Sequence, residues 1–208
     1  MNPILRDYRA GDESGAYSVC LKTGDHGKDG EALYREDPDA LGRIYVGPYL
    51  RFESHLAFIL EDGQGVCGYA LAAADSRAFY QRYDREWRPE LCRQFPEPRG
   101  DPSTWSPAQA IHHLYHHPDF FCPEPYELYP SHLHIDLLPR VQGRGHGRRM
   151  MEELLGRLRV RGSPGVHLGM SAVNQNAHRF YLKLGFRELA CAGEGDQRSI
   201  TMGKRLAT

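Results

Sequence analysis

The chain has no long apolar run and almost no net charge. Its 208 residues carry 26 Lys and Arg against 27 Asp and Glu, for a formal net charge of −1. No stretch approaches the roughly 20 apolar residues that cross a bilayer, and the first residues lack an apolar core of signal-peptide length. Without a global positive field, nucleic acid is not an expected partner. These absences predict a cytoplasmic protein that binds neither membranes nor nucleic acid.

Cysteine is scarce and follows no pattern. The five cysteines are an odd number, lie far apart and form no Cys-x-x-Cys pair. We therefore expect reduced thiols rather than a disulfide framework. Internal repeats and low-complexity tracts are also absent. The remaining composition, 40% apolar and 25% charged, is typical of a globular chain that is long enough to bury a core without staples.

Strand-like and helix-like segments alternate along the chain. This mixture predicts an α/β or α+β architecture with layers around one sheet. Residues 75–130 depart from it, because they hold most prolines, both tryptophans and a cluster of histidines. We read 1–208 as a single domain with an insertion over about 75–130 that shapes a site. The expected strands are 4–8, 56–61, 66–74, 131–138, 166–173, 186–191 and 198–203, and the expected helices are 12–22, part of 31–45, 145–160 and 176–184.

A glycine-rich run joins the strand 131–138 to the helix 145–160. It reads Gln142-Gly143-Arg144-Gly145-His146-Gly147-Arg148-Arg149. Bare amides and the positive end of a helix dipole at one place favour phosphate binding. Arginines are unfavourable at a helix start, and a bound polyanion would offset that cost. Neither a Rossmann fingerprint nor the Gly-Lys-Ser/Thr of a phosphate loop is present, and the alternative is a glycine-rich turn with solvated arginines.

A second motif follows the next strand and reads Asn174-Gln175-Asn176-Ala177-His178-Arg179-Phe180-Tyr181-Leu182-Lys183-Leu184-Gly185-Phe186. Together with Gln142-x-x-Gly145-x-Gly147, it resembles the signatures of the GNAT acetyltransferase superfamily, in that family's order and at about its spacing. The stretch 125–136 is also similar to the acetyltransferase-like C-terminal region of nucleocytoplasmic O-GlcNAcase. The resemblance covers mainly 131–205, with a weaker match over 4–74.

The resemblance implies a GNAT-like central sheet, mixed, mostly antiparallel and splayed, flanked by helices. It implies acetyl-CoA wedged between strands 131–138 and 166–173, with main-chain groups of this region along the pantetheine arm and Tyr181 near the sulfur. The implied cofactor-binding residues are Leu137, Leu138, Gln142, Gly143, Arg144, Gly145, His146, Gly147, Arg148, Asn174, Ala177, Phe180 and Tyr181. Arg140 and the arginines at 157, 159 and 161 either reach the 3′-phosphate or belong to a solvated face.

Candidate catalytic groups lie on the strand 131–138. Alternation places His132, His134 and Asp136 on one face. An acceptor amine with pKa near 10.4 must be neutral to react, which costs about 4.6 kcal/mol at pH 7. We expect Asp136 to act as base or substrate anchor, with His134 as a second candidate, and the alternative is the polar outer face of an ordinary strand. Tyr181 is the candidate acid or hydrogen-bond donor to the leaving thiolate, whereas Phe180, about 100° away on the helix, is expected in the core.

The insertion holds the run His112-His113-Leu114-Tyr115-His116-His117. Two i, i+4 histidine pairs are spaced to hold a metal, yet no cysteine or carboxylate completes a set in the sequence nearby. We therefore expect no metal site. The aromatic residues Trp87, Trp105, Tyr115 and Phe120 either wall an acceptor pocket or pack the insertion on the core.

These observations predict an acetyl-CoA-dependent N-acetyltransferase. Because no cysteine lies within the motifs, we expect direct transfer to an amine in a ternary complex. The acceptor is a small molecule or a protein lysine, and the protein is a monomer or homodimer. The alternatives are a non-catalytic acetyl-CoA-binding or interaction module and, less favoured, a histidine-rich metal sensor.

Overall fold

One seven-stranded sheet organises the molecule. The structure is a computed structural model that describes residues 2–206. The strand order is β1-β2-β3-β4-β5-β7-β6, and every neighbouring pair is antiparallel except β4–β5. The strands are β1 (Ile4–Asp7), β2 (Ala57–Asp62), β3 (Gly65–Ala73), β4 (Ser131–Leu137), β5 (Gly165–Ser171), β6 (Arg187–Ala192) and β7 (Ser199–Arg205). The predicted mixed, mostly antiparallel sheet is confirmed.

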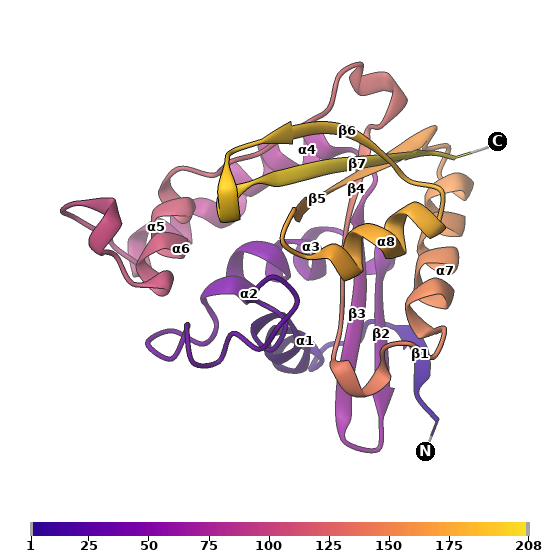
Figure 1. The fold of residues 1–208 in the computed structure, drawn as a ribbon, viewed down its shortest axis with the longest axis horizontal. Coiled ribbons are helices and arrows are strands. Elements are labelled where there is room, and N and C mark those ends of the chain that lie inside the picture. Colours follow the sequence, from indigo (N-terminus) through magenta and orange to yellow (C-terminus); the bar gives the residue numbers. More distant parts are fainter. Residues whose placement is uncertain (1, 207–208) are drawn as a thin grey trace.

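Helices cover the strands on either side (Figure 1). Helix α1 contacts β3 and β4, and α7 contacts β2, β3 and β4. Among the described residues, no helix has the length and apolar character needed to cross a membrane. The helices are α1 (Glu13–Leu21), α2 (Ala40–Tyr45), α3 (Gly47–Phe52), α4 (Ser76–Arg82), α5 (Arg88–Gln94), α6 (Pro107–His116), α7 (His146–Val160) and α8 (Gln175–Lys183).

The sheet splits between β4 and β5. These parallel strands pair only at Ser131–Val166 and His132–His167. Beyond that point they diverge, and Figure 1 shows β5, β6 and β7 crossing away from the upright β1–β4. The β5-facing edge of β4 therefore has no strand partner over most of its length.

Helix α7 starts and packs as its sequence predicts. The expected apolar stripe of Met151, Leu154, Leu155 and Leu158 is buried, and Met150 is buried with it. The N-cap, Gly145, has φ of 82°, a left-handed conformation that suits glycine. At the other motif, the Asn174 side chain accepts a 3.0 Å hydrogen bond from the Ala177 amide and caps α8. Gly185, with φ of 81°, follows the end of α8 as predicted.

The histidine-bearing face of β4 points into the protein. His132 is 4% exposed, its Nδ1 lies 2.7 Å from the Ser76 hydroxyl, and its ring stacks on Tyr80 with centroids 4.9 Å apart. The alternative of an ordinary solvated strand surface is therefore wrong. The aromatic residues of α3 and α4 cover the start of this face.

Two buried histidines make stability depend on pH. Burial lowers the pKa of both His132 and His167 below the ordinary value. The unfolded chain therefore binds protons that the folded chain does not, so the stabilisation is complete above pH about 6.5 and is lost as pH falls below it. We expect the free energy of unfolding to fall by up to about 1.4 kcal/mol per pH unit for each histidine.

Urea unfolding between pH 7.5 and 5.5 measures this slope, and His132→Gln should reduce it by about one proton. An unchanged slope in the variant, or a wild type that gains stability on acidification, would contradict the assignment.

Candidate active site

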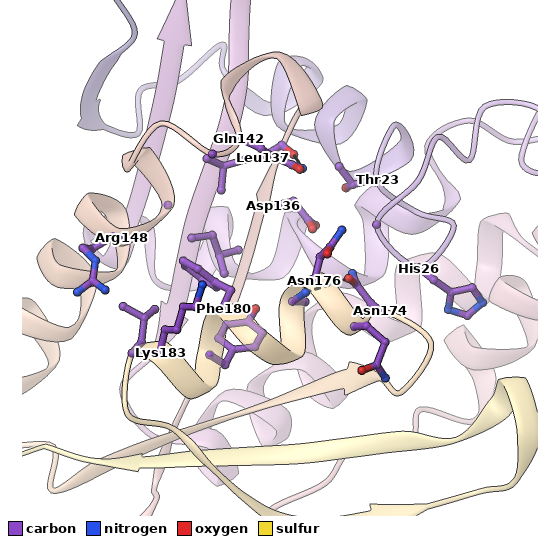
Figure 2. Close-up of a pocket in the computed structure, with 18 of the residues that line it drawn as sticks. Thr23, His26, Asp136, Leu137, Gln142, Arg148, Asn174, Asn176, Phe180 and Lys183 are labelled. Atoms are coloured by element: carbon purple, nitrogen blue, oxygen red, sulfur yellow. Dashed lines mark hydrogen bonds between the residues drawn. The ribbon is translucent and has the colours of Figure 1, made fainter.

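A cavity of about 710 Å³ fills the gap between the diverging strands. Figure 2 shows Asp136 and Leu137 of β4 on one side of it and Asn174, Phe180 and Lys183 on the other. Its walls come from β4, the loop before α7, the start of α8 and the loop after α1. The lining residues of the glycine run are Gln142, Gly143, Gly145, Gly147 and Arg148.

The glycine run presents unpaired amides to this cavity. In the described part of the chain, no backbone amide from Gly143 to Arg148 donates to a backbone carbonyl. Gly143 and Gly145 have φ of 71° and 82°, and a Cβ added at either would meet no atom within 4 Å. The run is therefore an open cradle of N–H donors that suits an anion.

Positive charge gathers around the same cavity. Helices α7 and α8 both begin there, so both positive dipole ends face it. Three cationic side chains, Lys28, Arg148 and Lys183, also line it. Asp136 is the one carboxylate among the described lining residues. This distribution of charge suits a polyanionic ligand, and the protein itself contributes a single carboxylate to the wall.

The open edge of β4 adds peptide groups to the site. Leu138 donates its amide to the Cys67 carbonyl at 2.9 Å, on the β3 side. Because alternate residues of an antiparallel strand bond to the same neighbour, the peptide groups of Ile135 and Leu137 face the gap instead. Gln142 Nε2 donates to the Leu137 carbonyl at 2.7 Å, so the Ile135 peptide and the Leu137 amide are left for an extended ligand.

A second cavity of about 220 Å³ adjoins the first on the side of α1 and α2. Its walls combine apolar and polar residues: Leu41, Tyr45, Leu133, Leu168 and Met170 with Thr23, His26, His134, Ser171 and Asn174. The residues that line both cavities are Thr23, His26, Ile135, Asp136, Asn174, Ala177 and Tyr181. Two candidate catalytic groups, Asp136 and Tyr181, therefore stand where the cavities meet.

Three polar side chains form a cluster at this junction. The buried Tyr69 hydroxyl donates to Asp136 Oδ2 at 2.5 Å and lies 3.0 Å from His134 Nε2. His134 Nε2 is itself 2.8 Å from Asp136 Oδ2. Burial and the charge of Asp136 raise the pKa of Tyr69, so its hydroxyl remains a donor. The cluster fixes the Asp136 carboxylate through one of its oxygens.

Tyr181 lines both cavities and is buried. It is 7% exposed, whereas Phe180 is only half-buried and lines the larger cavity. The expectation that Phe180 is the core residue is wrong, because α8 turns Tyr181 inward against Phe186. Burial, and secondarily the charge of Asp136, raises the pKa of Tyr181, which keeps its hydroxyl protonated at neutral pH.

Several residues predicted for the site lie outside the cavity. Leu138 is buried and its amide is bound to Cys67. Arg144 and His146 do not line either cavity. Arg140 forms a bidentate pair with Asp62, with its Nε 2.8 Å from Oδ2, and Arg157 bonds Asp7 at 2.6 Å. Both of these arginines therefore form ion pairs with residues of the sheet rather than lining the cavity.

Sequence reasoning missed the loop after α1 and Tyr69. Thr23, His26, Gly27 and Lys28 line the larger cavity. A Cβ at Gly27 would lie 2.5 Å from Asn174 Nδ2, so the loop packs directly on the cap of α8. The clue in the sequence was a polar loop with an isolated histidine, His26, between Gly24 and Gly27. In the structure, the φ of 51° at His26 marks a tight turn of this loop.

The insertion lines neither of these two cavities, and its aromatic residues pack on the protein instead. Trp87 bonds the Arg43 carbonyl at 2.8 Å, Tyr115 bonds the Ala40 carbonyl at 2.7 Å, and Phe120 stacks on Tyr80. Trp105 packs on His113 of α6. These contacts attach the insertion to α2 and to the buried face of β4.

A carboxylate does lie beside the histidine run, contrary to expectation. Glu97 Oε1 is 2.6 Å from His117 Nε2 and 3.7 Å from His113 Nδ1. The other i, i+4 pair is engaged elsewhere, since His112 contacts Asp37 at 2.8 Å and His116 the Phe95 carbonyl at 2.9 Å. The sequence could not show that the loop carrying Glu97 folds back on α6.

Comparisons with known proteins agree with this architecture. A family model described as an acetyltransferase (GNAT) domain matches residues 107–188. The crystal structure of SsHAT is 39% identical, with a TM-score of 0.88 and 100% of both chains covered. Protein O-GlcNAcase of Rattus norvegicus is 31% identical over 204 residues, which are 97% of this chain and 22% of the rat protein. The chain thus spans about a fifth of that relative's length.

The fold also matches a phosphinothricin acetyltransferase from Sinorhizobium meliloti, solved in complex with AcCoA. That match has 18% identity and a TM-score of 0.57, and it covers 99% of this chain and 89% of that one. The sheet, the glycine run and these matches define an acetyltransferase-type domain. The chain belongs to the GNAT acetyltransferase superfamily, and its predicted likeness to O-GlcNAcase is confirmed.

Proposed function

We propose that the protein is an acetyl-CoA-dependent N-acetyltransferase that transfers the acetyl group directly to an amine. One observation carries the proposal: the cradle of free amides at 143–148 opens into the same cavity as Asp136 and Tyr181. A diphosphate at one end and a reacting thioester at the other fit this arrangement.

The residues of the larger cavity suit acetyl-CoA along its length. Gly143 and Gly145 leave room for phosphate oxygens where any side chain would intrude, and Arg148 and Lys183 add positive charge. The free Ile135 peptide group and the free Leu137 amide match the alternating amides of a pantetheine arm. When bound, acetyl-CoA supplies an acetyl group activated as a thioester.

Asp136 is placed to take the proton of the acceptor amine. Its Oδ2 is held by Tyr69 and His134, while Oδ1 accepts no hydrogen bond from the described residues. The free oxygen can bind an ammonium and receive its proton as the amine attacks, directly or through one water. His134 is the second group that can accept this proton, because its Nε2 contacts Oδ2.

Tyr181 is placed to stabilise the leaving sulfur. With its pKa raised above the ordinary value near 10, full proton transfer to a thiolate of pKa about 8.5 is uphill. A hydrogen bond from its hydroxyl to the developing thiolate is the favoured role. Cys20 lines the smaller cavity, but burial raises the pKa of its thiol, so an acetyl-cysteine route is disfavoured.

The glycine cradle is tested by Gly145→Glu. The new carboxylate would occupy the anion position and add like charge, so we expect the affinity for acetyl-CoA and CoA to fall at least about 100-fold, or roughly 2.7 kcal/mol. Gly162→Glu is the matched control, because Gly162 has a similar φ of 77° and open surroundings but lies at the far end of α7. Calorimetric titration of the three proteins gives the affinities, and equal values would refute the cradle.

Catalysis is tested by Tyr181→Phe. We expect kcat to fall on the order of 100-fold with the KM for acetyl-CoA little changed, because one hydrogen bond to the developing charge is lost. Tyr83→Phe removes another buried hydroxyl, one without a partner and outside both cavities, and should keep full activity. Thiol release across an amine library is the assay. Silence with every amine despite tight CoA binding would favour the alternative of a non-catalytic acyl-CoA-binding module.

A further inference from the structure

The two adjoining cavities differ in charge. The larger one has three cationic side chains in its wall, Lys28, Arg148 and Lys183. Among the described residues, no Lys or Arg lines the smaller one, whose wall holds one carboxylate, Asp136, and the imidazoles of His26 and His134. A carboxylate of the ligand would therefore lie beside Asp136 with no permanent cation to pair with, which is costly.

Asp136 lines both cavities, and its two oxygens differ in their contacts. Oδ2 is shared between Tyr69 and His134, so its position is fixed by two hydrogen bonds. Oδ1 has no hydrogen-bond partner among residues 2–206. One fixed carboxylate oxygen in a partly buried setting matches one ammonium group.

Part of the wall of the smaller cavity is apolar. Leu133 and Leu168 come from the two diverging strands, and Leu41 and Tyr45 close it from α2. Its volume of about 220 Å³ is below the range of roughly 300–1,000 Å³ typical of sites for drug-sized ligands. The pocket therefore has room for a short hydrocarbon stem behind the amine.

We propose that the acceptor is a primary amine on a short apolar stem with no carboxylate next to the amine, which excludes α-amino acids. This rests on the proposed acetyltransferase function. The shared chemistry, an alkylammonium on a methylene chain, has two sources, namely a free alkylamine and a lysine side chain within a peptide.

The test uses pairs that differ only by a carboxylate next to the amine: pentylamine with norleucine, and butylamine with norvaline. We expect kcat/KM to be at least about 100-fold higher for each decarboxylated member, because the extra carboxylate meets Asp136 and no cation. Nα-acetyl-lysine amide distinguishes the sources: its acetylation on a par with pentylamine points to a peptide lysine, and its rejection points to a free amine. Equal rates within the pairs, or faster amino acids, would overturn the proposal.

Two variants at Gly169 sharpen the test. Gly169 lines the smaller cavity, and a Cβ there would meet nothing within 4 Å. Gly169→Arg should lower the preference for pentylamine over norleucine at least tenfold, since it supplies the missing cation. Gly169→Glu, of similar size and opposite charge, should keep the preference. If both variants changed the preference equally, charge would not be its cause and the proposal would fail.

Binding to the complex with CoA separates this proposal from the proposed activity. Calorimetry with the CoA-loaded wild type measures pentylamine and norleucine without turnover. Binding of pentylamine alone supports the pocket assignment even if no amine is acetylated, a result that would remove only the transferase function. Binding of both compounds alike, or of neither, would overturn the pocket assignment whether or not other amines react.

Discussion

The short pairing between β4 and β5 is the constraint on which the site depends. Two residue pairs hold these strands together, and then the sheet opens. Closing the gap with further ladder bonds would satisfy the Ile135 and Leu137 peptides but leave no room between the strands. The protein instead leaves those groups without a strand partner. Unpaired peptide groups at a buried strand edge are unfavourable unless a ligand supplies the hydrogen bonds. The same opening lets α8 lie across the gap with its N-terminus inside it.

The split sheet also separates two kinds of chemistry. Helix starts, glycine amides and cationic side chains line the larger cavity, where an anion can be held. Apolar side chains and one carboxylate gather toward α1 and α2. Tyr69 is paired with Asp136 across the β3–β4 ladder, and its hydroxyl donates a hydrogen bond to the Asp136 carboxylate. The proposed transfer would need both halves, since group transfer requires both partners to be positioned against each other.

Local patterns in the sequence predicted much of this arrangement. The glycine run and the stripe of α7 were predictable because each rests on residues within one or two turns. Tyr69 was not, because its contact with Asp136 spans 67 positions and depends on cross-strand register. Periodicity places Phe180 and Tyr181 on different sides of a helix but cannot say which side faces inward. The surroundings of the aromatic residues in the insertion and of Glu97 were not predictable either, since their neighbours depend on how distant loops fold back.

The two helix starts that share the cavity have a consequence for the ligand-free protein. Without a bound anion, the unpaired amides, the positive ends of the two helix dipoles and the three cationic side chains repel one another. An anion that binds there relieves the repulsion only in the folded chain, so by mass action the fold gains about 2.7 kcal/mol when the anion stands at 100 times its Kd. The melting temperature of this protein then reports the concentration of that anion, and the lifetime of the folded chain rises with it.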